Sequence, residues 1–250
     1  MSSARTETLY GLHAVRSLLL RHPQRVLRVC LQRERRNPRA EEIERLAVAA
    51  GRPVERIDAG QLRARLGDVV HQGVLAEVTP LAAWTEADLL QAVSGVPDPL
   101  VLALDGVQDP HNLGACLRTA DACGVLALLV PRDRAAPLNA TARKVAAGAA
   151  ETTPVAVVTN LARSLGLLKQ AGLWIVGADA AGSQPACELD LTGPRVLVLG
   201  AEAAGLRQLT RRHCDWIARL PGRGSVESLN VSVAAGMLLY EALRQRGLAG

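Results

Sequence analysis

The sequence predicts an α/β protein whose larger, C-terminal part is a mostly parallel sheet flanked by helices. Of its 250 residues, 49% are hydrophobic, which is enough to build a substantial core. From residue 100 onward, short apolar runs recur between helical segments, as is typical of strands covered on both faces. The predicted strands are Leu100–Leu104, Leu126–Val130, Val155–Val158, Leu173–Val176, Val196–Leu199 and Trp216–Leu220.

A smaller α/β domain is expected at residues 1–79. Apolar residues at helical spacing predict helices over Gly11–Leu20 and Arg39–Ala50. The predicted strands of this domain are Val26–Leu31, Val54–Ile57 and Gly73–Val78. Residues 80–99 are less regular and end in a stretch containing glycine and proline, so we interpret them as the linker to a C-terminal domain at 100–250.

The basic charge is concentrated in the N-terminal domain. The chain has a net charge of +5, and residues 1–70 contain 14 arginines against 8 acidic residues, whereas residues 71–250 contain 15 basic and 16 acidic residues. A phosphate-rich partner is therefore expected for the N-terminal part, although an arginine-rich composition alone produces the same excess. Phenylalanine is absent, and tyrosine and tryptophan are few, so base stacking on aromatic side chains is not expected.

The cysteine pattern argues against a metal site and a disulfide framework. There are five cysteines, an odd number, with no CxxC or Cys/His ligand spacing. The N-terminal residues lack an apolar signal region, and no apolar run reaches about 18 residues. We therefore expect a soluble protein of the reducing cytoplasm, with no membrane association and no metal ion.

Residues 220–246 predict a small-molecule pocket. A strand end is followed by a turn containing Gly222 and Gly224, and then by a long apolar helix. The helix is entered through Ser228, Leu229 and Asn230. Glycine lets a ligand approach the backbone, and the first turn of a helix offers unpaired N–H groups. An ordinary turn before a capped core helix would give the same pattern.

Residues 102–125, LALDGVQDPHNLGACLRTADACGV, predict a second polar group at a strand end. Asn112 is expected to cap a helix, with Arg118 about 9 Å further along its axis, so the two could hold two parts of one substrate. The alternatives are that Asn112 is only a cap and that Arg118 is a surface residue paired with Asp121.

Residues 196–206, VLVLGAEAAGL, provide a third group. Gly200 follows a predicted strand directly, and Glu202 stands where the next helix is expected to begin. An acidic residue is favoured there by the helix dipole. This pattern by itself is common.

Taken together, LDGVQDPHNLGACLRTADACG, LGAEAAGL and LPGRGSVESLNVSVAAGMLLYE closely resemble the three motifs of the TrmH-like (SpoU) branch of the SPOUT methyltransferases. The match covers about residues 100–246. The N-terminal segments YGLHAVRSLL and HQGVLAEV are similar to the substrate-binding domain, related to the ribosomal protein L30e fold, of guanosine 2′-O-methyltransferases that modify 23S ribosomal RNA.

The resemblance implies a C-terminal domain with a deep trefoil knot at which S-adenosylmethionine binds, although general topology rules disfavour knots. Matched onto this chain, the cofactor-binding positions are Gly200, Leu220 and Leu229, which contact the cofactor mainly through the backbone. The resemblance also implies a homodimer, with the apolar final helix contributing to its interface.

The resemblance further implies catalytic or substrate-positioning roles for five residues: Asn112, Arg118, Glu202, Ser228 and Asn230. In the family Arg118 is assigned to the loss of the 2′-hydroxyl proton. Because a guanidinium stays protonated to about pH 12, we favour a role in which Arg118 grips a phosphate or the developing alkoxide. The asparagines would orient the ribose and phosphate, Ser228 would line the pocket, and Glu202 would set the loop geometry or the Arg118 side chain.

Three alternatives and one departure accompany this assignment. A tRNA 2′-O-ribose methyltransferase shares the catalytic motifs, and a non-catalytic RNA-binding protein of ribosome assembly could share the fold. A dinucleotide-binding dehydrogenase is disfavoured because no GxGxxG follows the first strand. Where relatives commonly have Ile-Pro-Met, this chain has Leu220-Pro221-Gly222 followed by Arg223, which alters the side chains near the cofactor.

Overall fold

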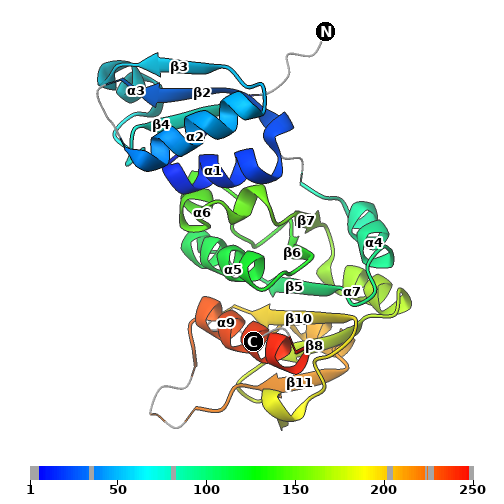
Figure 1. Ribbon diagram of the computed structural model, residues 1–250. Helices are drawn as coiled ribbons and strands as arrows, with labels where there is room; N and C mark the ends of the chain where they lie inside the picture. The colour runs from blue at the N-terminus through cyan, green and yellow to red at the C-terminus, as the bar shows by residue number, and fades with distance from the viewer. Residues whose placement is uncertain are drawn as a thin grey trace. The chain divides into compact units, whose positions relative to one another are not determined.

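A computed structural model describes residues 6–33, 37–79, 83–201, 205–222, 224 and 228–247. The chain forms two compact units, which we describe separately (Figure 1). The first unit comprises Met1–Ala82 with Ala147–Thr152, and the second comprises Ala83–Ala146 with Thr153–Gly250. The short segment 147–152 thus belongs to the first unit, although the chain before and after it belongs to the second.

The first unit contains a mixed four-stranded sheet in the order β1-β4-β2-β3. Its strands are β1 (Glu7–Tyr10), β2 (Val26–Gln32), β3 (Val54–Ile57) and β4 (Val74–Val78), and β4 runs antiparallel to both of its neighbours. The helices are α1 (Leu12–Arg21), α2 (Pro38–Ala49) and α3 (Ala59–Leu66), with a 3₁₀ turn, η1, at Pro23–Arg25. Helices α1 and α2 bury Val15 and Ile43 against the sheet, whereas α3 buries Leu62 with Ile57 and Leu75.

The inserted segment Ala147–Thr152 completes the first unit. It contains the 3₁₀ turn η2 (Ala149–Glu151), which packs on α1. Gly148 has a φ of 103°, and a Cβ atom there would lie 3.2 Å from Cβ of Ser17. The buried carboxylate of Glu151 forms an ion pair with Nη1 of Arg25 at 2.9 Å. Arg25 also donates from Nε to the carbonyl of Thr79 at 3.1 Å, so this arginine joins three parts of the unit.

The second unit is built on a seven-stranded sheet in the order β7-β6-β5-β10-β8-β11-β9, and the pairings between these strands are all parallel. The strands are β5 (Leu100–Asp105), β6 (Ala127–Pro131), β7 (Val155–Val158), β8 (Trp174–Ala178), β9 (Gln184–Pro185), β10 (Arg195–Gly200) and β11 (Trp216–Arg219). The prediction of a mostly parallel sheet is confirmed. The trefoil knot stays a prediction.

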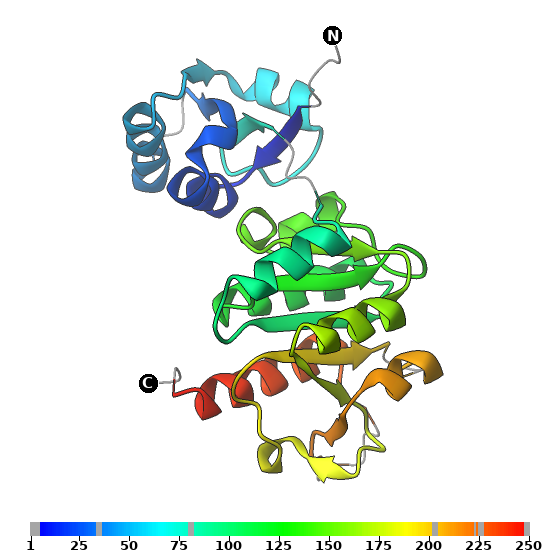
Figure 2. The same cartoon turned by 90° about the vertical axis from the view of Figure 1, so that its right-hand side faces the viewer.

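Helices cover both faces of this sheet (Figures 1 and 2). Helices α4 (Glu86–Ser94) and α7 (Leu161–Gln170) bury leucines and valines against one face, with the short α8 (Gln208–His213) beside α7. Helices α5 (Pro110–Ala122), α6 (Ala140–Val145) and α9 (Val231–Gln245) lie over the other face. Residues 80–99, which we interpreted as a linker, thus include a helix, because Thr85 and Asp88 form a capping box and Leu89 is buried.

Helix α5 lies between α6 and α9 and packs closely on both. A Cβ atom at Gly114 would lie 2.4 Å from the carbonyl oxygen of Ala142, so only glycine allows α6 to approach this closely. On the side of α9, a Cβ at Gly236 would be 3.9 Å from Cγ2 of Thr119, an ordinary contact. Helix α9 therefore contacts α5 at ordinary van der Waals distance, whereas the approach of α6 depends on glycine.

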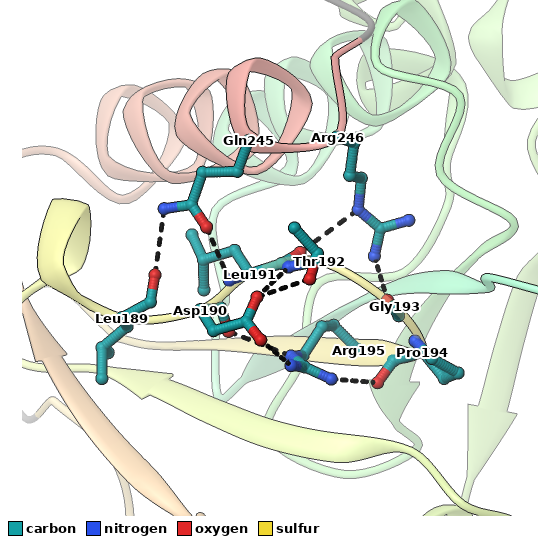
Figure 3. Close-up of polar contacts among 9 residues, drawn as sticks. All are labelled: Leu189, Asp190, Leu191, Thr192, Gly193, Pro194, Arg195, Gln245 and Arg246. Atoms are coloured by element: carbon teal, nitrogen blue, oxygen red, sulfur yellow. Dashed lines mark hydrogen bonds and ion pairs between the residues drawn. The ribbon is translucent and has the colours of Figure 1, made fainter.

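The C-terminal end of α9 is hydrogen-bonded to the segment 189–194, which precedes β10 (Figure 3). Gln245 donates from Nε2 to the carbonyl of Leu189 at 2.9 Å and accepts from the N–H of Leu191 at 2.7 Å. Arg246 donates to the carbonyls of Leu191 and Gly193. These residues lie at the amino edge of the sheet, where the parallel strands begin.

Candidate active site

The predicted site residues that the structure describes lie at the carboxyl edge of the large sheet. Because the strands are parallel, the ends of β5, β8, β10 and β11 are found along one edge, which is where ligands collect in such sheets. Gly200 ends β10, and Leu220 follows β11 directly. Helix α5 follows β5 after a short loop, so its first turn begins at the same edge.

The structure joins two of the predicted catalytic residues that are 118 positions apart. Nδ2 of Asn230 donates to Oδ1 of Asn112 at 2.9 Å. Asn112 lies in the first turn of α5, and Asn230 is the N-cap of α9. The expectation that Asn112 caps its helix is wrong: Asp109 is the cap, accepting from the N–H of His111, and Pro110 occupies the first helical position. Asn112 therefore does not serve as the cap.

The orientation of both amides follows from the cap at α9. Oδ1 of Asn230 accepts from the N–H groups of Ser232 at 2.9 Å and Val233 at 3.4 Å, and from Oγ of Ser232 at 2.6 Å. An oxygen must face these donors, so Nδ2 of Asn230 faces Asn112. Asn112 accepts that bond through its oxygen, so the contact fixes which end of the Asn112 amide faces Asn230.

Arg118 lies on the exposed side of α5, less than two turns after Asn112. Within the described part of the chain, Arg118 makes no hydrogen bond or ion pair, and Asp121 instead accepts from Oγ1 of Thr153 at 3.1 Å. The alternative in which Arg118 pairs with Asp121 is therefore not seen. An exposed guanidinium near the two asparagines is suited to bind a phosphate or an anionic oxygen.

The residues that precede α9 are open to a ligand. Ser228 is exposed, and 43% of Leu229 is exposed although its side chain is apolar. A Cβ atom at Gly222 or at Gly224 would meet no atom within 4 Å, so both glycine positions face open space. Open glycine positions and an exposed apolar side chain at Leu229 leave room for a ligand before α9. Glu202 and Arg223 lie outside the described residues.

At Gly200 the chain folds back on itself. Ala201 and Gly205 form an antiparallel bridge, and the N–H of Gly205 donates to the carbonyl of Ala201 at 2.8 Å. A Cβ atom at Gly200 would lie 2.1 Å from the carbonyl carbon of Gly205, so no other residue fits. One side of Gly200 is thus covered by the protein itself, and a ligand can reach its backbone only from another side.

Sequence reasoning missed two charged pairs at this edge. Asp105 ends β5 and is buried, and it binds both the backbone N–H and the guanidinium of Arg207. Asp179 follows β8 and binds Nη1 of Arg211 at 2.7 Å. The first pair, Asp105 with Arg207, could have been suspected from the sequence, because Asp105 ends an otherwise apolar strand and a buried carboxylate needs a partner.

The cap of α5 keeps a negative charge beside the site. The backbone N–H and the ring nitrogen of His111 both bind Asp109, which lowers the pKa of that carboxyl group below its usual value.

Burial raises the pKa of Cys116 and of Cys214 to about 12, so both thiols stay protonated at neutral pH. Neither cysteine is suited to act as a nucleophile.

Across the six described ranges, no group of three or more histidine, cysteine, aspartate or glutamate side chains could hold a metal ion. None of the described helices has the length and apolar character needed to cross a bilayer.

Two family models match this chain. The SpoU rRNA methylase family matches residues 99–240, and a family described as RNA 2′-O ribose methyltransferase substrate binding matches residues 8–84. Among curated proteins, the 23S rRNA (guanosine-2′-O-)-methyltransferase RlmB of Pseudomonas aeruginosa is 55% identical, covering 96% of this chain and 97% of the relative. The protein of the same name from Escherichia coli K12 is 46% identical, covering 96% of this chain and 99% of its own length.

Solved structures give the same result for the fold. The SpoU methyltransferase AviRb from Streptomyces viridochromogenes, in complex with AdoMet, has a TM-score of 0.78 and 27% identity, covering 96% of this chain and 90% of that one. An AdoMet-bound rRNA methyltransferase from Sinorhizobium meliloti has a TM-score of 0.75 and 26% identity, covering 96% and 87%.

Proposed function

The chain belongs to the SpoU rRNA methylase family, and from this we infer its reaction. It is an enzyme that transfers a methyl group from S-adenosylmethionine to the ribose 2′-hydroxyl of a guanosine in 23S ribosomal RNA. The resemblance noted in the sequence is thereby confirmed as family membership. The observation in the structure that best supports the reaction is the hydrogen bond between Asn112 and Asn230, formed where α5 and α9 begin.

We propose that this asparagine pair positions the ribose. S-adenosylmethionine supplies an electrophilic methyl group on a sulfonium, so the enzyme must hold the 2′-oxygen in line with it. The Asn112 amide is oriented by its bond from Asn230, so the two side chains would act together in orienting the ribose or the neighbouring phosphate. Asn230 cannot rotate without losing its bonds to the first turn of α9, which makes the pair rigid.

Arg118 is proposed to stabilise negative charge as the 2′-hydroxyl loses its proton. A guanidinium carries only N–H donors, so Arg118 would lower the energy of an alkoxide or hold the neighbouring phosphate, while the proton itself would leave to solvent water. Ser228 and Leu229 would contribute the pocket wall, and Gly200, Leu220 and Leu229 the backbone around the cofactor. Glu202 remains proposed for this site from the family motif.

The reaction is tested with radiolabelled S-adenosylmethionine and two substrates, unmethylated 23S ribosomal RNA and bulk transfer RNA. We expect label in the ribosomal RNA, at the 2′-oxygen of one guanosine when the product is mapped by resistance to alkaline cleavage. Label in transfer RNA alone would show that the substrate is wrong while the chemistry is right. No label in either RNA would contradict methyl transfer itself.

The proposed role of Arg118 predicts a separation of catalysis from cofactor binding. Arg118→Ala should reduce methyl transfer by more than about 100-fold, the range seen when one charge-stabilising donor is removed. The affinity for S-adenosylmethionine, measured by calorimetry, should change less than about threefold. A large loss of cofactor affinity would contradict this role.

We propose that the enzyme is a homodimer and that α9 contributes to the interface. The helix leaves three apolar side chains exposed at helical spacing: 51% of Val233, 43% of Met237 and 61% of Tyr240. A continuous apolar stripe of this kind is typical of a protein contact. Met237→Glu should shift the mass in light scattering from dimer to monomer. Val48→Glu, which changes an exposed valine of α2, should leave the mass unchanged.

The first unit is proposed to bind the RNA substrate. It matches the substrate-binding family and contains most of the arginine excess. Replacing Arg21 and Arg45, both exposed, with glutamate should weaken binding to 23S RNA fragments and reduce its salt dependence. Unchanged RNA affinity would contradict this assignment. An enzyme with a ribosomal RNA substrate is also proposed to reside in the cytoplasm, as the cysteine pattern suggested.

A further inference from the structure

Asp105 is the one residue of β5 that is both charged and buried. It is 1% exposed and is the last residue of the strand LVLALD. In the sheet register, Asp105 lies directly opposite Gly200 of β10. The carboxylate is therefore located beside the residue at which the cofactor-binding loop begins.

Arg207 binds this carboxylate through two different groups. Its backbone N–H donates to Oδ2 of Asp105 at 2.9 Å, and its guanidinium donates from Nε and forms an ion pair from Nη2, both with Oδ1. Arg207 follows the closed turn in which Gly205 is bonded to Ala201. Asp105 thus holds one end of the Gly200 loop through the strand pairing and the other end through Arg207.

A second acid lies on the opposite side of the same loop. Asp179 follows β8, the other neighbour of β10, and binds Arg211. A Cβ atom at Gly205, whose φ is 59°, would lie 3.3 Å from Oδ2 of Asp179. The described ends of the loop are therefore enclosed between two aspartates. Asp105 bonds to Arg207, two positions after Gly205, whereas Asp179 bonds to Arg211, six positions after it.

We propose that Asp105 and Arg207 are positioning residues that set the affinity for S-adenosylmethionine by fixing Gly200 and Gly205, the described ends of the loop that follows β10. This inference depends on the proposed function, because it assigns the loop to that cofactor. A buried carboxylate is tolerated only while its charged partner is in place, so Arg207 has one strongly preferred position next to Gly205. A preorganised loop binds a ligand more tightly because its ordering is complete before binding.

The test uses the full-length protein and a matched control from the other end of the same strand. Arg195 begins β10, is also buried, and forms an ion pair with Asp190 at 3.4 Å. The variants are Arg207→Met, Arg207→Lys, Asp105→Asn and, as the control, Arg195→Met. For each we would measure the S-adenosylmethionine Kd by calorimetry, the melting temperature, and kcat with saturating cofactor.

Arg207→Met and Asp105→Asn should each raise the Kd for S-adenosylmethionine at least about tenfold, equivalent to about 1.4 kcal/mol. Their kcat at saturating cofactor should change less than about threefold. Arg207→Lys should recover part of the affinity, because an ammonium restores the charge without the planar fork. Arg195→Met should lower the melting temperature while leaving the Kd unchanged.

The proposal is overturned if Arg207→Met and Asp105→Asn lower the melting temperature as Arg195→Met does but leave the cofactor affinity unchanged. Asp105→Asn preserves the shape of the side chain and serves as the second variant should Arg207→Met fold poorly. A wild-type protein that binds no S-adenosylmethionine would contradict the proposed function rather than the role of this pair.

Discussion

The two edges of the large sheet are fastened by similar chemistry but differ in what they leave exposed. At the amino edge, Arg195, Gln245 and Arg246 bind backbone carbonyls of the segment before β10. At the carboxyl edge, Arg207 is bound to the carboxylate of Asp105, whereas the side chains of Arg118 and Ser228 are exposed to solvent. Helix α9 reaches from one edge to the other, with Asn230 at one end and Gln245 at the other. The comparison suggests that one end of this helix serves stability and the other serves catalysis.

The largest expected contrast is between two glycines beside β10. Gly200→Ala should abolish cofactor binding and reduce activity by more than about 100-fold, because its Cβ would meet the backbone of Gly205 at 2.1 Å. Gly193→Ala at the amino edge should cost only about 1–2 kcal/mol of stability for its φ of 65°, since the nearest atom is 3.7 Å away. Calorimetry measures the affinity of each variant for S-adenosylmethionine, and denaturant unfolding measures the stability of each variant. A Gly200→Ala protein with normal affinity would remove the proposed difference between the edges.

A second contrast compares the two ends of α9. Asn230→Ala should cost about 0.5–2 kcal/mol for the lost cap and should also lower kcat by more than tenfold, because the orientation of Asn112 is lost. Gln245→Ala breaks two bonds to the segment before β10 and should cost a similar amount of stability while kcat changes less than about twofold. Equal effects on kcat would show that α9 acts as a single unit in catalysis.

The smallest contrast concerns acid stability, in which the two edges should behave alike. Thr192, through its hydroxyl and its N–H, lowers the pKa of Asp190, as His111 lowers that of Asp109. A carboxyl group whose pKa is lowered by folding stabilises the protein above its unfolded value of about 3.9, and this contribution is lost as the pH falls below about 4. Asp190→Asn and Asp109→Asn should each flatten the acid limb of a melting-temperature profile. A steeper acid limb in either variant would contradict the assignment.

The sheet of the second unit was predictable from the sequence because its strands are short apolar runs. The predicted Val155–Val158 is β7, and the other five predicted strands differ from the observed ones by one or two residues at an end. Their order across the sheet was not predicted, since it depends on contacts between distant segments. Helix α4 was missed because the glycine and prolines that follow it at residues 95–99 resembled a linker, although its capping residues Thr85 and Asp88 were visible.

Within the site, family motifs identified residues that periodicity alone could not. Local capping preferences assigned Asn112 to the cap, but Asp109 followed by Pro110 fits that position better. The bond between Asn112 and Asn230 depends on how α5 packs against α9, which no local pattern reports. The pairing of Asp105 with Arg207 spans 102 positions and was likewise beyond reach of spacing arguments.

The segment that completes the first unit has a consequence for how the protein is made. Arg25 is translated early, but its buried counter-charge, Glu151, follows 126 positions later. Until that glutamate has left the ribosome, the nascent N-terminal unit contains a cation whose partner does not yet exist. Synthesis from the N-terminus therefore cannot finish the first unit before more than half of the chain has been translated.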